Sequence, residues 1–407
     1  MKIGFWMTGL VFSASMTALL PPAQAHDHST ENQIVEIMWA GSEHLSLGES
    51  GALNACRDLG ISKADCPISN IPRGDGKINF AYGEILMAAD FYNGPSELYA
   101  DKRKGIKHVI KCTHAEIHGN KPKTCNSIAT FFSMPRYLGV VTKNYNHFGW
   151  YNMKDYVRYH QEAIDKALKS FELRDSAPQK SLQLYQQAMI LNAFADHYLT
   201  DAFSSGHVRV PRVQTAMWGK ENFKGLLKKN RGDLVTMLLH DNESMDLRTG
   251  REIGLPVANS YGDVWMTRGD GHLHIDSNPL DPVRLQPENA VRESVKEVLF
   301  AALYGQAPKG IFAATWLVPF SRDIPFHVKF SAEYQHMSKM DFVNSFFRDI
   351  PLVKATHVVR HDLGRSLNAM PEIFAEFRKA VRKDIQTIPE LTRRLPAPYL
   401  EAFSNVN

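Results

Sequence analysis

Two histidines and an aspartate in the stretch 195–207 have the types and the spacing that metal chemistry needs. His197 and Asp201 are four residues apart, so on a helix their side chains leave the same face about one turn apart. The Ser-Ser-Gly run at 204–206 should loosen this helix, because Ser and Gly are poor residues for a helix interior. That loosening brings His207 to the end of the same face. Two imidazoles and a carboxylate that converge in this way are what a transition-metal site requires.

A helix over 182–203 must position this cluster, and it is the strongest helical pattern in the chain. Apolar residues cover much of its circumference, so the helix should be buried. His197 and Asp201 therefore lie inside the protein, where an unpaired charge is not tolerated. Further helical patterns cover 34–39, 79–92, 156–171, 219–239, 289–304, 339–347 and 369–391. Because no two-residue alternation is sustained and no internal repeat is visible, we expect a mainly α fold.

The N-terminal residues 1–25 have the features of a secretory signal peptide. Lys2 gives a positive start, 5–20 is mostly apolar, and 23–25 is an A-x-A cleavage site. A transmembrane anchor is the alternative, but polar residues interrupt the apolar run. Cleavage would leave His26 as the new N-terminus. We expect a soluble mature protein, secreted or periplasmic, with no transmembrane anchor.

Four cysteines remain after cleavage, and export to an oxidising compartment favours disulfide bonds. Each neighbouring pair encloses a short loop with Pro, Gly or Asn, so we predict Cys56–Cys66 and Cys112–Cys125 bonds. Zinc binding by cysteine is the alternative, but no C-x-x-C spacing occurs. The sequence leaves the other two pairings open.

The formal net charge falls from +4 to +3 when Lys2 is removed with the signal peptide. So weak a charge does not by itself indicate a nucleic-acid partner. We expect one domain over 26–306 and a C-terminal extension over 307–407, whose last helical pattern is basic on one side. That side is either a solvated face or a contact with an anionic lipid surface or a partner. Its basic residues are Arg378, Lys379, Arg382, Lys383, Arg393 and Arg394.

Asp90, His147 and His44 are further candidate ligands. Asp90 stands among apolar residues at 87–92, where a buried carboxylate is costly unless it is paired or bound to a metal. The alternative is an aspartate that faces water at a helix end. His147 lies among aromatic residues, where packing is the usual role, and a lone histidine such as His44 is usually a surface or capping residue.

The pattern His197-x-x-x-Asp201-x-x-x-x-x-His207 resembles the central zinc motif of the superfamily of bacterial zinc-dependent phospholipases C and fungal-type zinc nucleases. The residues around it are more similar to a secreted bacterial phospholipase C branch typified by Pseudomonas and Legionella enzymes. In that superfamily a helical Asp, and then the His of a His-Phe loop, precede the central motif. Asp90 and His147 resemble these two residues in that order. The resemblance implies one zinc ion shared by Asp90, His147, His197 and Asp201, a ligand set that suits Zn²⁺.

The resemblance also implies a second zinc ion, bound by His207, a later His and an acidic residue four positions after it. His240 is the best match for the later His. Ser244 stands four residues after it, so we take Glu243 as the acid. The alternatives are Asp241, or His272 with Asp276 in a loop-like stretch.

The third zinc ion of the superfamily takes the terminal amine of the mature chain, a nearby His and the bridging Asp of the central motif. His44 and Asp201 match the last two. His26 would be the terminal residue here, whereas the superfamily uses a Trp. Trp39 would serve instead if residues 26–38 were removed as a pro-segment.

What the resemblance implies is a zinc-dependent phospholipase C-like helical domain. Such an enzyme cleaves a glycerophospholipid, such as phosphatidylcholine, into diacylglycerol and a phosphorylated headgroup at a membrane surface. Three zinc ions suit this chemistry, because a zinc-bound water ionises near neutral pH and the metal charge stabilises the phosphate oxygens. Asp90 is the candidate to orient or deprotonate that water. The alternatives are a secreted single-strand nuclease or nucleotidase on the same scaffold, and a zinc-binding protein without catalysis.

Overall fold

A computed structural model describes residues 41–73, 76, 78–102, 104–125, 133–141, 143–224, 228–244, 254–273, 278, 280–321 and 365–404. The predicted signal peptide over 1–25, the candidate terminal residue His26 and Trp39 lie outside these residues. No helix in the described part of the chain is both long and apolar enough to cross a membrane.

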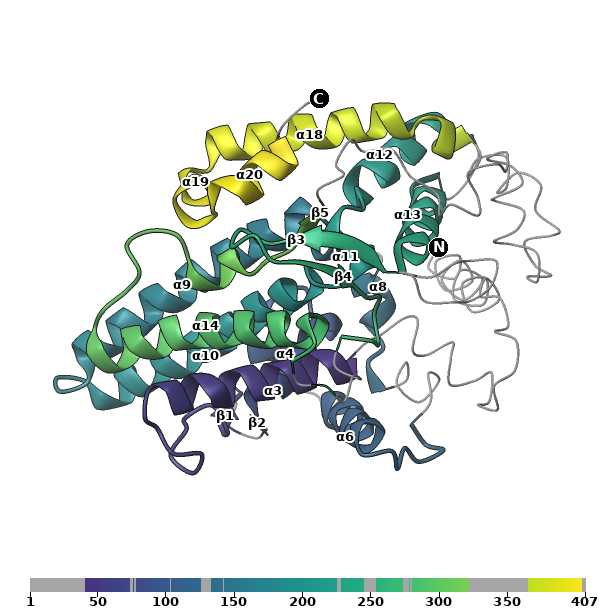
Figure 1. The fold of residues 1–407 in the computed structure, drawn as a ribbon. Helices are drawn as coiled ribbons and strands as arrows, with labels where there is room; N and C mark the ends of the chain where they lie inside the picture. Colours follow the sequence, from purple (N-terminus) through teal and green to yellow (C-terminus); the bar gives the residue numbers. More distant parts are fainter. Residues whose placement is uncertain are drawn as a thin grey trace, which may run out of the picture.

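Four helices form the centre of the molecule and confirm the predicted mainly α fold. They are α3 (Gly41–Asp58), α9 (Trp150–Leu173), α10 (Pro178–Asp201) and α14 (Pro282–Tyr304), and they lie side by side (Figure 1). Further helical elements surround them. These are α4 (Tyr82–Ala88), η1 (Ala89–Phe91), α5 (Pro95–Ala100), α6 (Gly105–Ile117), α8 (Tyr137–Val141), η2 (Tyr145–His147), α11 (Ser205–Val208), α12 (Arg212–Asn222), α13 (Lys228–Ser244), η3 (Ala313–Trp316), α18 (Met370–Thr387), α19 (Pro389–Arg394) and α20 (Ala397–Ser404).

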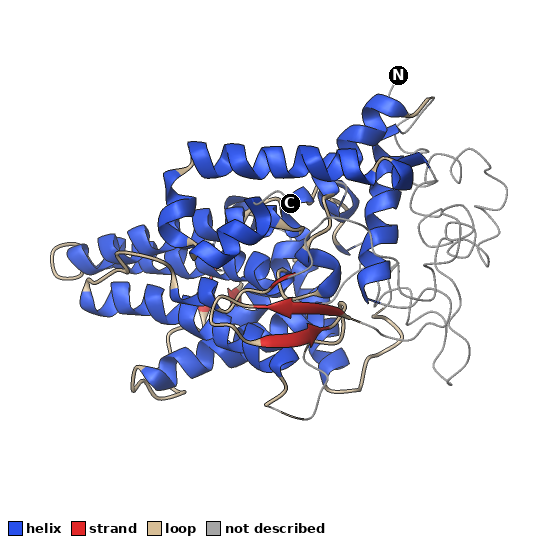
Figure 2. Cartoon of the chain, turned by 45° about the horizontal axis from the view of Figure 1, so that its top comes forward, coloured by secondary structure: helices blue, strands red, loops and turns tan. Residues whose placement is uncertain are grey.

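Two small antiparallel sheets lie among the helices (Figure 2), although the sequence pattern did not indicate strands. β1 (Ile71–Pro72) pairs with β2 (Asn79–Phe80). In the other sheet, β3 (Leu255–Ala258) lies between β4 (Val264–Thr267) and β5 (Phe320–Ser321). Strands of two to four residues are too short to show a sustained two-residue alternation. β4 leads directly into a loop that reaches the candidate site.

α10 is buried on all sides over its second half, as its apolar circumference predicted. Every residue of 188–201 is buried. Asp196 lies on one face of α10. The Tyr82 hydroxyl donates to Oδ2 of Asp196 at 2.6 Å, and the Ser294 hydroxyl donates to Oδ1 of Asp196 at 2.5 Å. Burial raises the pKa of Asp196 to about 7. These contacts hold α10 against α4 and α14, so the helix is a rigid carrier for the side chains near its end.

A close approach of α3 to α4 brings two candidate ligands into one region. A Cβ atom on Gly83 would lie 2.2 Å from the carbonyl oxygen of Leu45, and one on Gly48 would lie 2.8 Å from the Cα of Gly83. Only glycine allows the two backbones to come this close. His44 lies near the start of α3 and Asp90 lies in η1, directly after α4.

The described parts of 307–407 pack onto the central helices. The Trp150 ring nitrogen in α9 donates to the Asp384 carboxylate in α18 at 3.1 Å. Arg394 is only 5% exposed and donates to the carbonyl oxygen of Pro308 at 2.9 Å. Arg394 therefore differs from the other residues of the predicted basic side. Its guanidinium satisfies buried carbonyl groups, which need donors, rather than facing a solvated surface.

Both predicted disulfides are confirmed, and none of the four cysteines is free. Cys56–Cys66 joins the end of α3 to the following loop, and Cys112–Cys125 joins α6 to the loop after it. Closing a loop of this size stabilises a fold by about 3 kcal/mol, mainly by restricting the unfolded chain.

Candidate metal centre

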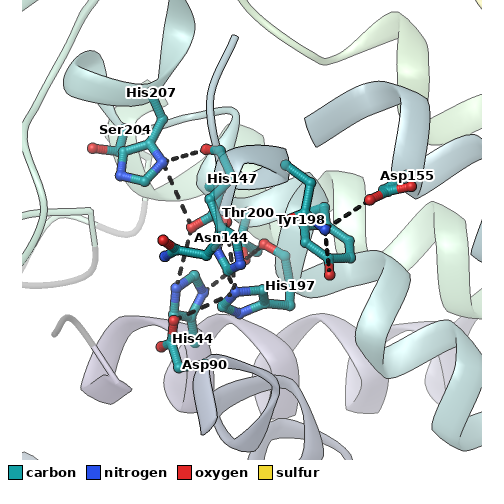
Figure 3. A network of polar contacts seen from close by, with 12 residues as sticks. His44, Asp90, Asn144, His147, Asp155, His197, Tyr198, Thr200, Ser204 and His207 are labelled. Carbon is teal, nitrogen blue, oxygen red and sulfur yellow. Dashed lines mark hydrogen bonds and ion pairs between the residues drawn. The ribbon is translucent and has the colours of Figure 1, made fainter. Parts of the chain in front are cut away.

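The end of α10 is the centre of a buried cluster of histidines and aspartates. His197 is fully buried and Asp201, the last residue of α10, is 6% exposed. His44 from α3, Asp90 from η1 and His147 from η2 gather around His197 (Figure 3). The helical spacing of His197 and Asp201 thus has the predicted result, since both side chains enter one cluster.

Ligand atoms of Asp90, His147 and Asp201 lie close to the His197 ring. The Nε2 atom of His197 is 3.1 Å from Nδ1 of His147, 3.6 Å from Oδ1 of Asp90 and 3.5 Å from Oδ2 of Asp201. That same Asp201 oxygen is 2.9 Å from Nδ1 of His147. Ligand atoms around a tetrahedral zinc ion, each about 2.0–2.1 Å from the metal, lie about 3.3 Å apart. The structure therefore brings Asp90, His147 and His197 together as one candidate metal-binding group, and Oδ2 of Asp201 lies beside its two imidazoles.

Asp201 has its two carboxylate oxygens directed to different partners. Oδ2 faces His147 and His197, whereas Oδ1 is 3.4 Å from Nε2 of His44 and 4.0 Å from Nδ1 of His207. His44, His197 and Asp201 form a further group whose ligand atoms lie close enough to hold an ion. A carboxylate in this position can bridge two ions, as the sequence resemblance implies for Asp201.

A separate group consists of His207, His240 and Asp270. The Oδ2 atom of Asp270 is 3.1 Å from Nε2 of His240 and 3.5 Å from Nε2 of His207. His207 and His240 are the two imidazoles predicted to share an ion. Asp270 is the acidic member of this candidate group, and sequence reasoning missed it because it lies in a loop and its spacing from His240 has no periodic signal.

Glu243, the predicted acid, has another partner. Its Oε1 accepts hydrogen bonds from Nε and the terminal NH2 group of Arg209 at 3.0 and 2.6 Å. Burial raises the pKa of Glu243, although Arg209 opposes that shift. The structure does not bring Glu243 into a metal-binding group, and Asp270 occupies the place expected for it. Of the alternatives, His272 is exposed, whereas Asp276 and the side chain of Asp241 lie outside the described part of the chain.

Hydrogen bonds from several elements hold the loop that carries Asp270. The Ser205 N–H donates to the carbonyl of Arg268 at 2.8 Å, and the Ser204 hydroxyl donates to Oδ1 of Asp270. The Leu273 N–H donates to the carboxylate of Glu43 in α3. Burial would raise the pKa of Asp270, but the charges and hydrogen bonds of the two imidazoles keep this pKa well below its usual range. Asp270 is therefore an anchored, ionised carboxylate.

The backbone next to His147 connects the two regions of the cluster. Nδ1 of His207 lies 2.5 Å from the His147 carbonyl oxygen, which can only accept, so this nitrogen carries the proton. In the neutral imidazole, Nε2 of His207 would then have the lone pair to bind an ion beside Asp270. The Gly149 N–H donates to the carbonyl of His207 at 2.7 Å, and Gly149 has a φ of 56°, which favours glycine. The ring of Phe148 stacks on His207 at a centroid distance of 4.4 Å.

Burial and neighbouring charges shift the pKa values of the groups in the cluster. Burial keeps the pKa of His197 well below its usual value, so this imidazole is neutral. Burial would raise the pKa of Asp201, but the surrounding imidazoles outweigh this effect and keep the pKa well below its usual range. Burial raises the pKa of Asp90 to about 6. Burial would lower the pKa of His44, but Asp201 raises it to about 9, so a metal ion would displace a proton there.

Two buried polar atoms of the cluster, Oδ2 of Asp201 and Nδ1 of His197, have no hydrogen bond within the described part of the chain. Oδ2 faces imidazole nitrogens at 2.9 and 3.5 Å without the angles of a hydrogen bond. A buried carboxylate oxygen left in this state is costly, and a cation among the same atoms would satisfy it. The donor set of imidazoles and carboxylates fits Zn²⁺, and His44 would give up its proton when the ion binds.

Gly206 gives a direct test of the group around Asp270. A Cβ atom at this position would lie 2.2 Å from Cδ2 and 2.6 Å from Nε2 of the His240 ring. Gly206→Ala should therefore push His240 away from Asp270 and weaken zinc binding at this group by at least about tenfold. Zinc affinity is measured by competition with a chromogenic chelator. Gly139→Ala is the control, because its Cβ would meet nothing within 4 Å. Equal zinc affinity in both variants would contradict this position for His240.

Comparison with known proteins gives no relative. No family model matches the chain, and neither the curated proteins nor the solved structures contain a match. Function must therefore be inferred from the geometry of the cluster and from the motif resemblance.

Proposed function

We propose that this protein is a zinc-dependent phospholipase C that hydrolyses glycerophospholipids such as phosphatidylcholine. The observation that carries the proposal is that candidate ligands from separate segments meet at Asp201. One oxygen of its carboxylate faces His147 and His197, and the other faces His44. The order of Asp90, His147 and the motif at 197–207 along the chain supports the same family. Two disulfides support an oxidising location, and we infer that residues 1–25 are a secretory signal peptide.

The ligand groups have a division of roles that suits phosphodiester hydrolysis. Zinc ions bound here would polarise phosphate oxygens and supply a water of lowered pKa as nucleophile. Asp90 has a 19% exposed side chain, whereas that of His197 is 1% exposed, so Asp90 marks the side from which water and substrate can enter. Its carboxylate, with a pKa raised to about 6, is ionised at neutral pH and can orient or deprotonate water. Asp201 and the neutral imidazoles hold the metal charge in place.

A comparison of two substrates tests the proposal. Purified protein is incubated with phosphatidylcholine vesicles and with single-stranded DNA, with a chelator and after zinc is returned. We expect diacylglycerol and phosphocholine from the vesicles, loss of this activity with the chelator, recovery with zinc, and intact DNA. His197→Ala should be inactive, whereas His118→Ala, an exposed histidine outside the groups, should keep full activity.

Other outcomes of this experiment separate the remaining functions. Zinc-dependent cleavage of DNA without lipid hydrolysis would assign the nuclease function that the same motif permits. Bound zinc without hydrolysis of either substrate would indicate a protein that binds zinc and does not catalyse. Either outcome would overturn the phospholipase proposal.

A further inference from the structure

Thr200 is a buried residue of α10 that the catalytic proposal does not use. It is 1% exposed and immediately precedes Asp201. Its hydroxyl oxygen lies 2.8 Å from Nδ1 of His44, which comes from α3, a distant part of the sequence. The same oxygen lies 2.9 Å from the carbonyl of Asp196 and 3.0 Å from the carbonyl of His197.

The number of protons in this contact decides which nitrogen of His44 has a lone pair for a metal ion. A threonine hydroxyl has one proton, and a backbone carbonyl can only accept. A helical threonine usually donates its proton to a carbonyl three or four residues before it, which here is that of His197 or Asp196. Nδ1 of His44 must then donate to the Thr200 oxygen. In the neutral imidazole that can bind a metal ion, this leaves Nε2 of His44 as the nitrogen with a lone pair. Nε2 is the atom that lies 3.4 Å from Oδ1 of Asp201.

The reverse arrangement would block the site. If Thr200 donated to Nδ1 of a neutral His44, the ring proton would be on Nε2 and would point toward Asp201. That proton would occupy the direction in which a metal ion has to bind. Without the hydroxyl, Nδ1–H would be a buried donor with no partner in this contact, which is costly, and the ring would lose its fixed orientation.

We propose that Thr200 is a positioning residue that holds His44 with Nε2 directed to the metal ion beside Asp201. The inference rests on the proposed zinc centre and adds to it a residue that does not bind zinc. α10 then supplies His197 and Asp201 as ligands and also the hydroxyl that orients the ligand from α3. The three parts of this arrangement lie within two turns of one rigid helix.

Two variants and one spectroscopic measurement test this role. Thr200→Val keeps the shape of the side chain and removes the hydroxyl, whereas Thr200→Ser keeps the hydroxyl. In chelator competition we expect Thr200→Val to weaken one class of zinc site by about 10–100-fold, and Thr200→Ser to stay close to wild type. In wild-type protein with ¹⁵N-labelled histidine and bound zinc, the His44 signals, assigned with His44→Gln, should show zinc on Nε2 and a proton on Nδ1.

Each contrary result has a distinct meaning. Zinc on Nδ1 of His44 in wild type, or an unchanged zinc affinity in a folded Thr200→Val protein, would overturn the role of Thr200 and leave the zinc centre in place. Because the nitrogen that His44 uses is observed in wild type, this test does not depend on the folding of Thr200→Val. Absence of zinc binding by the wild-type chain would overturn the zinc centre and the role of Thr200 together.

Discussion

Asp201→Asn should abolish phosphatidylcholine hydrolysis and lower the zinc content of the protein. Asp201 is the carboxylate that faces two groups of imidazoles, with Oδ1 and Oδ2 on different partners. An amide has one oxygen and no charge, so it cannot bridge two ions, and it leaves the ion charge uncompensated in a buried place. We expect a loss of activity of more than about 100-fold. Zinc per chain is measured by elemental analysis, and activity by diacylglycerol release.

Asp165→Asn is the matched control for this substitution. Asp165 is an exposed aspartate of α9 that accepts a hydrogen bond from Gln161, and the variant should keep both zinc and activity. If Asp201→Asn retained wild-type zinc content and rate, Asp201 would not be a bridging ligand, and the two-sided geometry of its carboxylate would need another explanation.

Asp270→Asn should lower zinc content and hydrolysis, whereas Glu243→Gln should keep bound zinc and lower the stability of the fold. Asp270 lies between His207 and His240, so Asp270→Asn should release zinc from this group and reduce hydrolysis by about 100-fold or more. Glu243 forms a buried ion pair with Arg209, so Glu243→Gln should keep its zinc. Glu243→Gln removes this carboxylate charge from beside a buried guanidinium and should destabilise the fold by about 3 kcal/mol.

The two variants are compared by zinc content and by thermal unfolding. Each is a control for the other, because both remove one buried carboxylate charge near the same histidine. Zinc loss in Glu243→Gln together with full zinc in Asp270→Asn would contradict the geometry described here. It would also restore Glu243 as the ligand that the spacing after His240 favours.

These two acids show why part of the site could be predicted from sequence and part could not. His197 and Asp201 are on one helix, so a spacing of four is enough to place them together. Glu243 follows His240 by three residues on α13, and helical spacing alone favours it. The local sequence does not indicate that Arg209, two residues after His207, forms an ion pair with Glu243. Asp270 comes from a loop, where relative position depends on tertiary contacts and not on periodicity.

The fold, like the site, could be predicted only in part from the sequence. The long buried helix over 182–203 and the mainly α class could be predicted from apolar periodicity. The small sheet could not, because β3, β4 and β5 have at most four residues each. Yet this sheet delivers Asp270 to the cluster. His44 and Asp90 were expected from the motif resemblance, whereas the close contact at Gly83 that brings them near each other is visible only in three dimensions.

The number of zinc ions bound by the wild-type chain is the most direct test of a metal centre at the end of α10. Native mass spectrometry of purified protein counts these ions before and after treatment with a chelator. We expect at least two zinc ions per chain, removed by the chelator and reduced in a variant with His197→Ala and Asp201→Ala. A wild-type chain that binds no zinc, or equal zinc in that double variant, would contradict a zinc centre built on His197 and Asp201.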